Sequence, residues 1–348
     1  MSNAPLVSSS TTELDTTQLA VGTPIKVSGK GLPLWVDYAL RRAGGLLFSA
    51  VLLVVVTFFI VPLIPGDPAV AIAGADATTE QIESIRERLG LNLPLIVQFF
   101  DYVGGIFTGN LGDSFAYGQP VVNIILTKMP FTLQLASLGI VIVLAVSIPL
   151  GMLVGVATQG GRRNWLDVAF GVVTGFFQSI PQYVTATVLV VVFAITLRVL
   201  PAAGAVAPGA MILPLAAISV GPICSIARVV RRETATVLEQ DFMRTARGMR
   251  LSAVRQYARH ALPNLLTTAL TLSGLILAGM LGGAIIIETV FSWPGLGQEV
   301  VTAILYKDYP VIQGVILVLG SIAIVLNLTI DVILGIIDPR TLGASHGR

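Results

Sequence analysis

Charged residues are scarce in this sequence, and histidine and cysteine are almost absent. Asp, Glu, Lys and Arg make up 11% of the 348 residues, whereas 54% are hydrophobic. Soluble domains carry about 25% charged residues, so most of this chain is unsuited to water. Two histidines and one cysteine exclude a disulfide framework and a dedicated His/Cys metal site. The net charge of +2 is too small to indicate nucleic-acid binding.

Motifs that enzymes and ion-driven transporters need are also missing. The sequence has no Gly-x-x-x-x-Gly-Lys-Ser/Thr phosphate loop, so energy from ATP has to come from another subunit. The only histidines, His260 and His346, lie outside the centres of the apolar segments, which leaves an intramembrane hydrolase without a base. An ion-coupled secondary transporter would need intramembrane carboxylate pairs or inverted repeats, and neither is visible. We therefore expect no catalytic residue, metal or cofactor in this chain.

Long stretches without any formal charge dominate what is present. Six such windows occur, and each can hold one helix of the ~20 apolar residues that cross a bilayer. Turn residues such as Pro201 and Gly204 shorten the windows. Since lipid leaves bare peptide groups without partners, we predict an all-α, polytopic membrane protein. Its six membrane-spanning helices are expected near residues 45–64, 131–157, 167–197, 212–230, 265–288 and 311–333.

Arginine is concentrated on one side of these six helices. Eight arginines lie between Arg228 and Arg259, in the segment that joins the fourth and fifth helices. The positive-inside rule places this segment and both termini in the cytoplasm. Residues 1–32 are rich in Ser, Thr and Gly and are expected to form a disordered cytoplasmic tail.

A transmembrane domain is expected over residues 33–340, followed by a short C-terminal tail at 341–348. It contains a large exterior loop at 65–128 and a cytoplasmic loop at 231–263. Leu34 to Leu40, just before the first span, fits either an interfacial elbow helix or a plain continuation of that span.

One helix is predicted in the exterior loop. Thr78 is its N-cap, Gln81 completes a capping box, and Gly90 ends it.

The cytoplasmic loop predicts two short amphipathic helices. The first spans residues 242–247 and ends at Gly248, and the second begins after Ser252 and ends before Pro263. One face of the first helix is expected to be apolar and the other basic. The apolar face consists of Phe242, Ala246 and Met249, and the basic face of Arg244, Arg247 and Arg250.

This segment resembles the coupling ("EAA") loop of ABC importer permeases. Thr245-Ala246 match the start of that motif, and His260, Leu262 and Pro263 match its end. The family's glycine falls at Arg250 here, so we expect Gly248 to supply the turn. The resemblance implies an ATPase-coupling role for the following residues: Asp241, Phe242, Arg244, Thr245, Ala246, Gly248, Arg250, His260, Leu262 and Pro263.

Four further stretches narrow the resemblance, which extends from about Trp35 to Arg340. Their order and spacing are similar to those of first-type permease subunits of dipeptide, oligopeptide and nickel ABC importers, which have the type I importer fold. The stretches are Leu63-Ile64-Pro65-Gly66-Asp67-Pro68-Ala69, Gly109-Asn110-Leu111-Gly112-Asp113-Ser114, Glu288-Thr289-Val290-Phe291-Ser292-Trp293-Pro294-Gly295-Leu296-Gly297 and Asp338-Pro339-Arg340.

The resemblance implies a complex in the cytoplasmic membrane of a prokaryote that imports peptides by alternating access. Expected partners are a second homologous permease, two ATP-binding subunits that hold ATP and Mg²⁺, an extracytoplasmic substrate-binding protein and membrane lipid, but no nucleic acid. Nickel chelates, glutathione and haem are alternative substrates, and an ion-coupled secondary transporter is the alternative mechanism.

Candidates for the translocation path come from polar residues at membrane depth. Pro181 interrupts the third span among polar neighbours. Such a break either lines a water-filled path or is a kink that serves helix packing. The path candidates are Gln134, Gln178, Ser179, Pro181 and Gln182. Glu288 is expected at the outer boundary, where its carboxylate would reach water. The small-x-x-x-small pairs at 151/155, 171/175 and 279/283 are consistent either with close packing against a partner or with ordinary helix packing.

Overall fold

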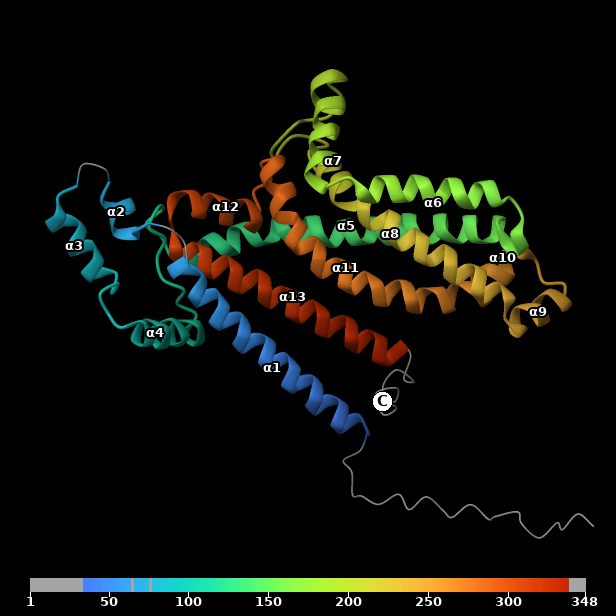
Figure 1. The fold of residues 1–348 in the computed structure, drawn as a ribbon, viewed down its shortest axis with the longest axis horizontal. Coiled ribbons are helices and arrows are strands. Elements are labelled where there is room, and N and C mark those ends of the chain that lie inside the picture. Colours follow the sequence, from blue (N-terminus) through green and yellow to red (C-terminus); the bar gives the residue numbers. More distant parts are fainter. Residues whose placement is uncertain (1–33, 64–65, 75–76, 338–348) are drawn as a thin grey trace, which may run out of the picture.

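The computed structural model describes residues 34–63, 66–74 and 77–337. The tails predicted at 1–32 and 341–348, and the Asp338-Pro339-Arg340 motif, lie outside the described residues. Figure 1 shows a bundle of long helices with groups of short helices at its two ends. The described ranges contain no β-strand, only an isolated bridge between Asp113 and Pro120. The all-α prediction is therefore confirmed.

Six crossings of a membrane can be traced. Five helices are long and apolar enough to span alone, and a pair bent by 92° makes the sixth. This agrees with the predicted six-helix fold. The single helices are α1 (Leu34–Ile60), α5 (Val121–Ala157), α8 (Ile212–Glu239), α11 (Leu262–Val290) and α13 (Tyr309–Ile337). The bent pair is α6 (Asn164–Ser179) and α7 (Gln182–Leu189), which continues into the π-helical segment η3 (Val190–Thr196).

Several helices extend beyond the apolar windows that predicted them. α1 is already helical at Leu34, so the first span continues into its flank and no separate elbow helix forms. α5 begins at Val121 and runs through Pro130, and α8 continues to Glu239 past its arginines. Helices end at caps and helix breakers rather than at the membrane boundary, which explains these longer spans.

The most extensive contact between two helices of the described bundle joins α5 and α8. A Cβ atom on Gly151 would lie 2.6 Å from the carbonyl oxygen of Ala227, and one on Gly155 would lie 2.7 Å from the Cβ of Thr234. These two glycines therefore permit the close helix approach that their spacing predicts. A Cβ atom on Gly171 or Gly175 of α6 would meet no other segment within 4 Å, so this pair makes no such close approach in the described residues.

Short helices occupy the two ends of the bundle (Figure 1). At one end lie α2 (Pro68–Ala73), α3 (Thr79–Arg88), α4 (Leu95–Thr108) and α12 (Leu296–Tyr306). At the opposite end lie α9 (Asp241–Gly248) and α10 (Ala253–Gln256), which the π-helical segment η4 (Tyr257–Ala261) joins to α11. Single 3₁₀ turns, η1 (Val61–Leu63) and η2 (Gln159–Gly161), follow α1 and α5.

The loop between α1 and α5 holds three helices where the sequence predicted one. The predicted helix is α3, and its capping box is present. Thr78 N–H donates to Gln81 Oε1 at 2.9 Å, and Gln81 N–H donates to Thr78 Oγ1 at 3.4 Å. Gly90 follows with a positive φ of 66°, as a residue that ends a helix often does.

Candidate functional site

The break in the third span is where Pro181 stands. Ile180 is extended (φ −75°, ψ 122°), the geometry that steric contact with the following proline ring favours. The chain then turns by 92°, and Pro181 is the N-cap residue of α7, a position where its missing N–H breaks no intrahelical hydrogen bond. The carbonyl of Pro181 accepts hydrogen bonds from Val184 N–H at 3.0 Å and Thr185 N–H at 3.2 Å. The predicted interruption of this span is thus confirmed.

A cavity of about 520 Å³ adjoins this break. Four helices contribute to its wall: α6, α7, α8 and α11. Most of the wall is apolar, and the polar side chains on it are Gln178, Gln182, Thr185 and Ser225. This volume and this mixture of an apolar wall with a few polar groups are typical of sites for small molecules.

A second proline faces the same cavity from α8. Pro222 lies inside that helix and cannot donate to the carbonyl of Ile218, four residues earlier. Ile218 and Pro222 both line the cavity, as does Pro181. Two helices therefore interrupt their backbone hydrogen bonding at one cavity, which adds polar groups at membrane depth.

The structure brings together three of the five predicted path residues. Gln178, Pro181 and Gln182 line the cavity. The Ser179 hydroxyl instead donates to the carbonyl of Gly175 at 2.8 Å, and Gln134 is exposed on α5 away from the cavity lining.

At the opposite end from α12, α9 packs on the base of the bundle through Met243 and Ala246. Both are buried, and Met243 joins an apolar cluster with Val237, Leu238 and Leu265. Of the three residues predicted to form the apolar face, only Ala246 is buried in this contact. Phe242 and Met249 are exposed, because packing follows the i, i+3 pair of Met243 and Ala246.

The turn after α9 lies at Arg250 and not at Gly248. Gly248 is the last helical residue, whereas Arg250 has a left-handed φ of 54°. This conformation costs a non-glycine residue roughly 1–2 kcal/mol. The expectation that Gly248 supplies the turn is wrong, since the chain turns at the position of the family's glycine.

The sequence predicted that the second helix of the loop would end before Pro263. The structure contradicts this prediction. Ser252 precedes α10 but makes no capping bond with its side chain, and helical structure then runs unbroken from Ala253 to Val290 over 38 residues. Pro263 falls in the first turn of α11, next to the π-helical η4, where its missing N–H is accommodated. One helix consequently connects this loop to the far end of the bundle.

The arginines of this end have several partners. Arg247 donates to the carbonyl of Leu238, which ties α9 to α8, and Arg231 forms an ion pair with Asp167 of α6. The Asn264 side chain donates to the carbonyl of His260 at 2.9 Å. The side chains of Arg244 and Asp241 are 3.4 Å apart and exposed, so this pair adds little stability.

Glu288 corrects another expectation from the sequence. Its exposed fraction is 0%, so its carboxylate does not reach water. Oε1 accepts from the Thr132 hydroxyl at 2.6 Å, and Oε2 accepts from the N–H groups of Gly297 at 2.6 Å and Gln298 at 3.1 Å. Leu296 N–H donates to Thr132 Oγ1 at 2.8 Å. Free N–H groups at a helix start attract an anion, and this attraction overrides the preference of the carboxylate for water.

A second buried carboxylate, Asp308, holds the loop before α5 to the start of α13. It accepts from Ser114 Oγ at 2.5 Å and from the N–H groups of Phe115 and Ala116 at 3.1 and 3.0 Å. Lys128 of α5 pairs with the buried Glu299 of α12 at 3.2 Å.

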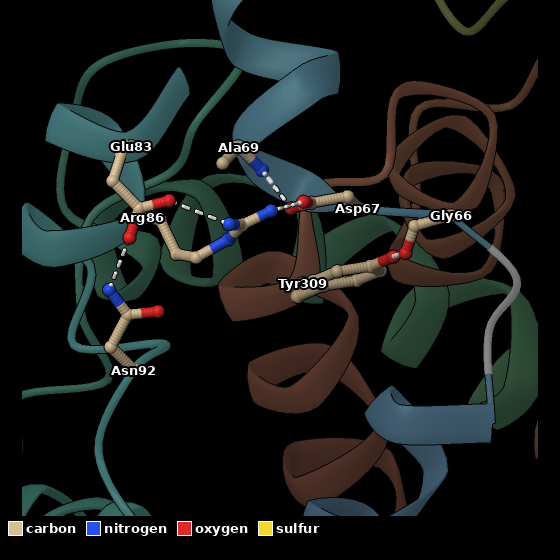
Figure 2. Close-up of polar contacts among 7 residues, drawn as sticks. All are labelled: Gly66, Asp67, Ala69, Glu83, Arg86, Asn92 and Tyr309. Carbon is tan, nitrogen blue, oxygen red and sulfur yellow. Dashed lines mark hydrogen bonds and ion pairs between the residues drawn. The ribbon is translucent and has the colours of Figure 1, made fainter. Parts of the chain in front are cut away.

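Asp67 organises the segment after α1, as Figure 2 shows. One carboxylate oxygen accepts from Ala69 N–H at 2.9 Å and so caps α2, and the other meets the guanidinium of Arg86 in α3. Arg86 lowers the pKa of Asp67 and its own pKa is raised. Arg86 also binds Glu83 at 2.7 Å, and the Tyr309 hydroxyl donates to the carbonyl of Gly66 at 3.2 Å.

The sequence analysis did not predict the contacts that the carboxylates of Asp67, Glu288 and Asp308 make. The Asp67-Pro68 pair carries a recognisable signal, an N-cap followed by proline at the first helical position. Glu288 and Asp308 carry none, because their side-chain partners lie more than a hundred residues away in the chain.

Comparison with known proteins supports one assignment across the whole bundle. A family described as "Binding-protein-dependent transport system inner membrane component" matches residues 147–343, and the N-terminal family of the same transport-system membrane component matches residues 35–136. The dipeptide transport system permease protein DppB of Lactococcus lactis is 36% identical over 306 residues, which are 88% of this chain and 99% of DppB. The glutathione transport system permease protein GsiC of Salmonella typhimurium is 35% identical over 306 residues, covering 87% of this chain and 98% of GsiC.

A solved structure shows the same fold. The inward-facing MetNI methionine ABC transporter has a chain that aligns with a TM-score of 0.52 at 18% identity, covering 62% of this chain and 97% of that one. The chain therefore belongs to the binding-protein-dependent transport system inner membrane components, and it is a multi-pass transport subunit of the ABC importer permease type.

Proposed function

We propose that this subunit passes peptides across the cytoplasmic membrane of a prokaryote in an ATP-driven importer, with both of its termini in the cytoplasm. The observation that carries this proposal is the cavity at the break of the third span. Its amide side chains, Gln178 and Gln182, and the interrupted helices around them offer donors and acceptors to a solute rich in peptide groups. The names of DppB and GsiC, a dipeptide and a glutathione permease, support this substrate class.

The partners proposed are a second homologous permease, two ATPase subunits that bind ATP and Mg²⁺, and an external substrate-binding protein. The exposed face of α9 suits an ATPase, because Phe242 and Met249 offer apolar contacts beside the cationic Arg244. Val254 on α10 is exposed on the neighbouring arm. Movement of this loop would pass along the continuous helix from Ala253 to Val290 and change access to the cavity.

Reconstitution with the co-purified partners in proteoliposomes tests the proposal. We expect ATP-dependent uptake of a radiolabelled dipeptide that requires the binding protein. Uptake of only a nickel chelate or haem would reject the peptide substrate, and uptake driven by an ion gradient without ATP would reject the importer mechanism.

Two matched pairs of variants test the assigned roles. Gln182→Ala should reduce uptake several-fold, whereas Gln134→Ala, on the exposed surface of α5, should leave it unchanged. The double replacement of Phe242 and Met249 by Ala should lower binding-protein-stimulated ATP turnover and uptake together while the subunit remains folded. Val206→Ala, at a fully exposed site near the opposite end of α8, is the control. Equal uptake in all variants would contradict both the substrate-contact role of Gln182 and the coupling role of Phe242 and Met249.

A further inference from the structure

The helix α4 is apolar but too short to cross a membrane. Its 14 residues span about 21 Å, whereas the hydrocarbon core is about 30 Å thick. Large apolar side chains on it are open to the surroundings, with exposed fractions of 64% for Ile96, 65% for Phe100 and 86% for Phe107. Such a surface marks a contact with a partner or with lipid.

The residues of α4 sort into three faces at 100° per residue. Ile96, Phe100 and Phe107 share the open apolar face. Phe99 and Tyr102 share a second face, and this one packs on α1, where the ring of Phe58 lies 5.2 Å from that of Phe99 and 5.8 Å from that of Tyr102.

The polar face of α4 lies opposite the open apolar face. Gln98 and Asp101 occupy it, and Asp101 is exposed. A short helix with separate apolar and polar faces has the pattern of a helix that lies in a membrane interface.

Contact with α1 fixes the depth of α4 relative to the membrane. Phe58 lies in the last turn of α1, which ends at Ile60, so α4 sits at the level where the first span leaves the hydrocarbon (Figure 1).

A chain of aromatic rings connects the surface of the first span to the open face of α4. Ring centroids are 5.3 Å apart for Phe59 and Phe58, 5.2 Å for Phe58 and Phe99, and 5.8 Å for Phe99 and Phe100. Phe59 is 49% exposed on a membrane-spanning helix, a position that lipid ordinarily surrounds, and the ring contacts through the buried Phe58 link it to Phe100. Continuity with this lipid-facing surface favours lipid over a protein partner.

We propose that α4 is an interfacial helix that lies in the bilayer leaflet at the α2–α4 end of the molecule, the outer leaflet under the proposed topology. The Ile96, Phe100 and Phe107 face lies among acyl chains, and Asp101 faces water. The helix thereby anchors the α2–α3 segment at the α12 end of the bundle. This inference rests on membrane insertion and not on the peptide substrate.

Spin labels on the reconstituted complex test this placement. Cys224, the one cysteine of the sequence, is replaced by Ser, and single cysteines are placed at Ile96, Phe100 or Phe107, with Asp101 as the matched control. At the three apolar positions, collisions with oxygen should exceed collisions with an aqueous nickel chelate several-fold, at a depth of about 5–10 Å. The ratio should be reversed at Asp101.

Two results would overturn the proposal. High accessibility to the aqueous chelate at the apolar positions would place this face in water. Low accessibility to both reagents would place it under protein, and a change on adding the external binding protein would identify that protein as the cover. The three positions report independently, so a variant that fails to assemble leaves two others. Loss of ATP-driven peptide uptake would leave this depth profile unchanged, which separates the two proposals.

Discussion

The two ends of this molecule are held together by different chemistry. At the α12 end, the buried carboxylates of Glu288 and Asp308 accept hydrogen bonds from backbone N–H groups of neighbouring segments. At the α9 end, the short helix rests on two buried side chains, Met243 and Ala246, and on one arginine–carbonyl hydrogen bond. Its remaining surface is exposed.

This difference indicates which end moves. A buried carboxylate with several fixed donors has one favourable geometry, and displacing it leaves charged and polar groups without partners. A small apolar contact such as that of α9 can shift with a smaller loss. We therefore expect the α12 end to move as a rigid body with α11, and the adjustment between conformations to take place around α9 and η4.

Removal of the Glu288 carboxylate should have the largest effect on stability of the changes that test this comparison. Glu288→Ala leaves the first N–H groups of α12 and the Thr132 hydroxyl without an acceptor. We expect the free energy of unfolding to fall by about 4 kcal/mol. Denaturant titration of the purified subunit measures this change. Glu288→Gln keeps one acceptor oxygen and should lose about half as much; equal stability of Glu288→Ala and wild type would contradict a rigid α12 end.

Removal of Asp308 should have the next largest effect. Asp308→Ala frees Ser114 and the N–H groups of Phe115 and Ala116, and this should lower the free energy of unfolding by about 3 kcal/mol. Faster proteolytic cleavage between residues 113 and 120 is the direct measurement. Asp113→Ala, at an exposed carboxylate on the same loop, is the control and should be cleaved as slowly as wild type.

At the α9 end, Met243 is buried and its neighbour Phe242 is exposed. Replacing each by Ala should distinguish an effect on folding stability from an effect on ATPase coupling. Met243→Ala removes a fully buried side chain and should lower the free energy of unfolding by about 2 kcal/mol. Phe242→Ala, at the adjacent exposed position, should change it by less than about 0.5 kcal/mol and should instead lower binding-protein-stimulated ATP turnover in the reconstituted complex. The same loss of stability in both variants would show that α9 is buried on both sides.

Local signals in the sequence predicted much of this architecture. Charge-free windows located the six crossings, the Thr78–Gln81 capping box located α3, and Pro181 located the break at the cavity. Each of these depends on residues that are close in the chain. The wall that α8 and α11 give to the cavity was not predicted, because Ser225 and Met280 lie in helices whose sequence alone does not show which face points inward.

Tertiary contacts explain the features that were predicted wrongly or not predicted at all. Glu288 is 156 residues from Thr132 and Asp308 is 194 residues from Ser114, so no local pattern identifies these pairs. The turn at Arg250 failed for a different reason. A left-handed arginine costs only roughly 1–2 kcal/mol, and packing of Met243 and Ala246 fixes where α9 ends regardless of this cost.

Because the left-handed conformation of Arg250 is unfavourable, its replacement by glycine should give a smaller change in stability than the variants above, and this change should be an increase. Arg250→Gly relieves the left-handed strain and should raise the free energy of unfolding by about 0.5–1 kcal/mol, since glycine also gains freedom in the unfolded chain. Gly248→Ala, at a helical position with open space around it, should also stabilise by up to about 1 kcal/mol. If Arg250→Gly destabilised the subunit, the turn would depend on the guanidinium and not on backbone geometry.

The smallest expected effect lies at the α12 end, in the partly exposed pair of Asp67 and Arg86 (Figure 2). Arg86 lowers the pKa of Asp67 below its ordinary value of 3.8. The stability from this pair is therefore complete above pH 3.8 and is lost as the pH falls through the lower pKa of the folded state. Asp67→Asn keeps an oxygen that caps α2 at Ala69 but removes the charge.

Melting temperatures of wild type and Asp67→Asn between pH 3 and 6 measure this contribution. The wild type should be slightly more stable near pH 6, and the difference between the two curves should begin to narrow as the pH falls below 3.8. Because both side chains are about one-third exposed, solvent screens the pair, and 1 M salt should reduce the difference further. A difference that is constant with pH would show that Asp67 acts only as a helix cap. In that case the α12 end would be held by its buried carboxylates alone.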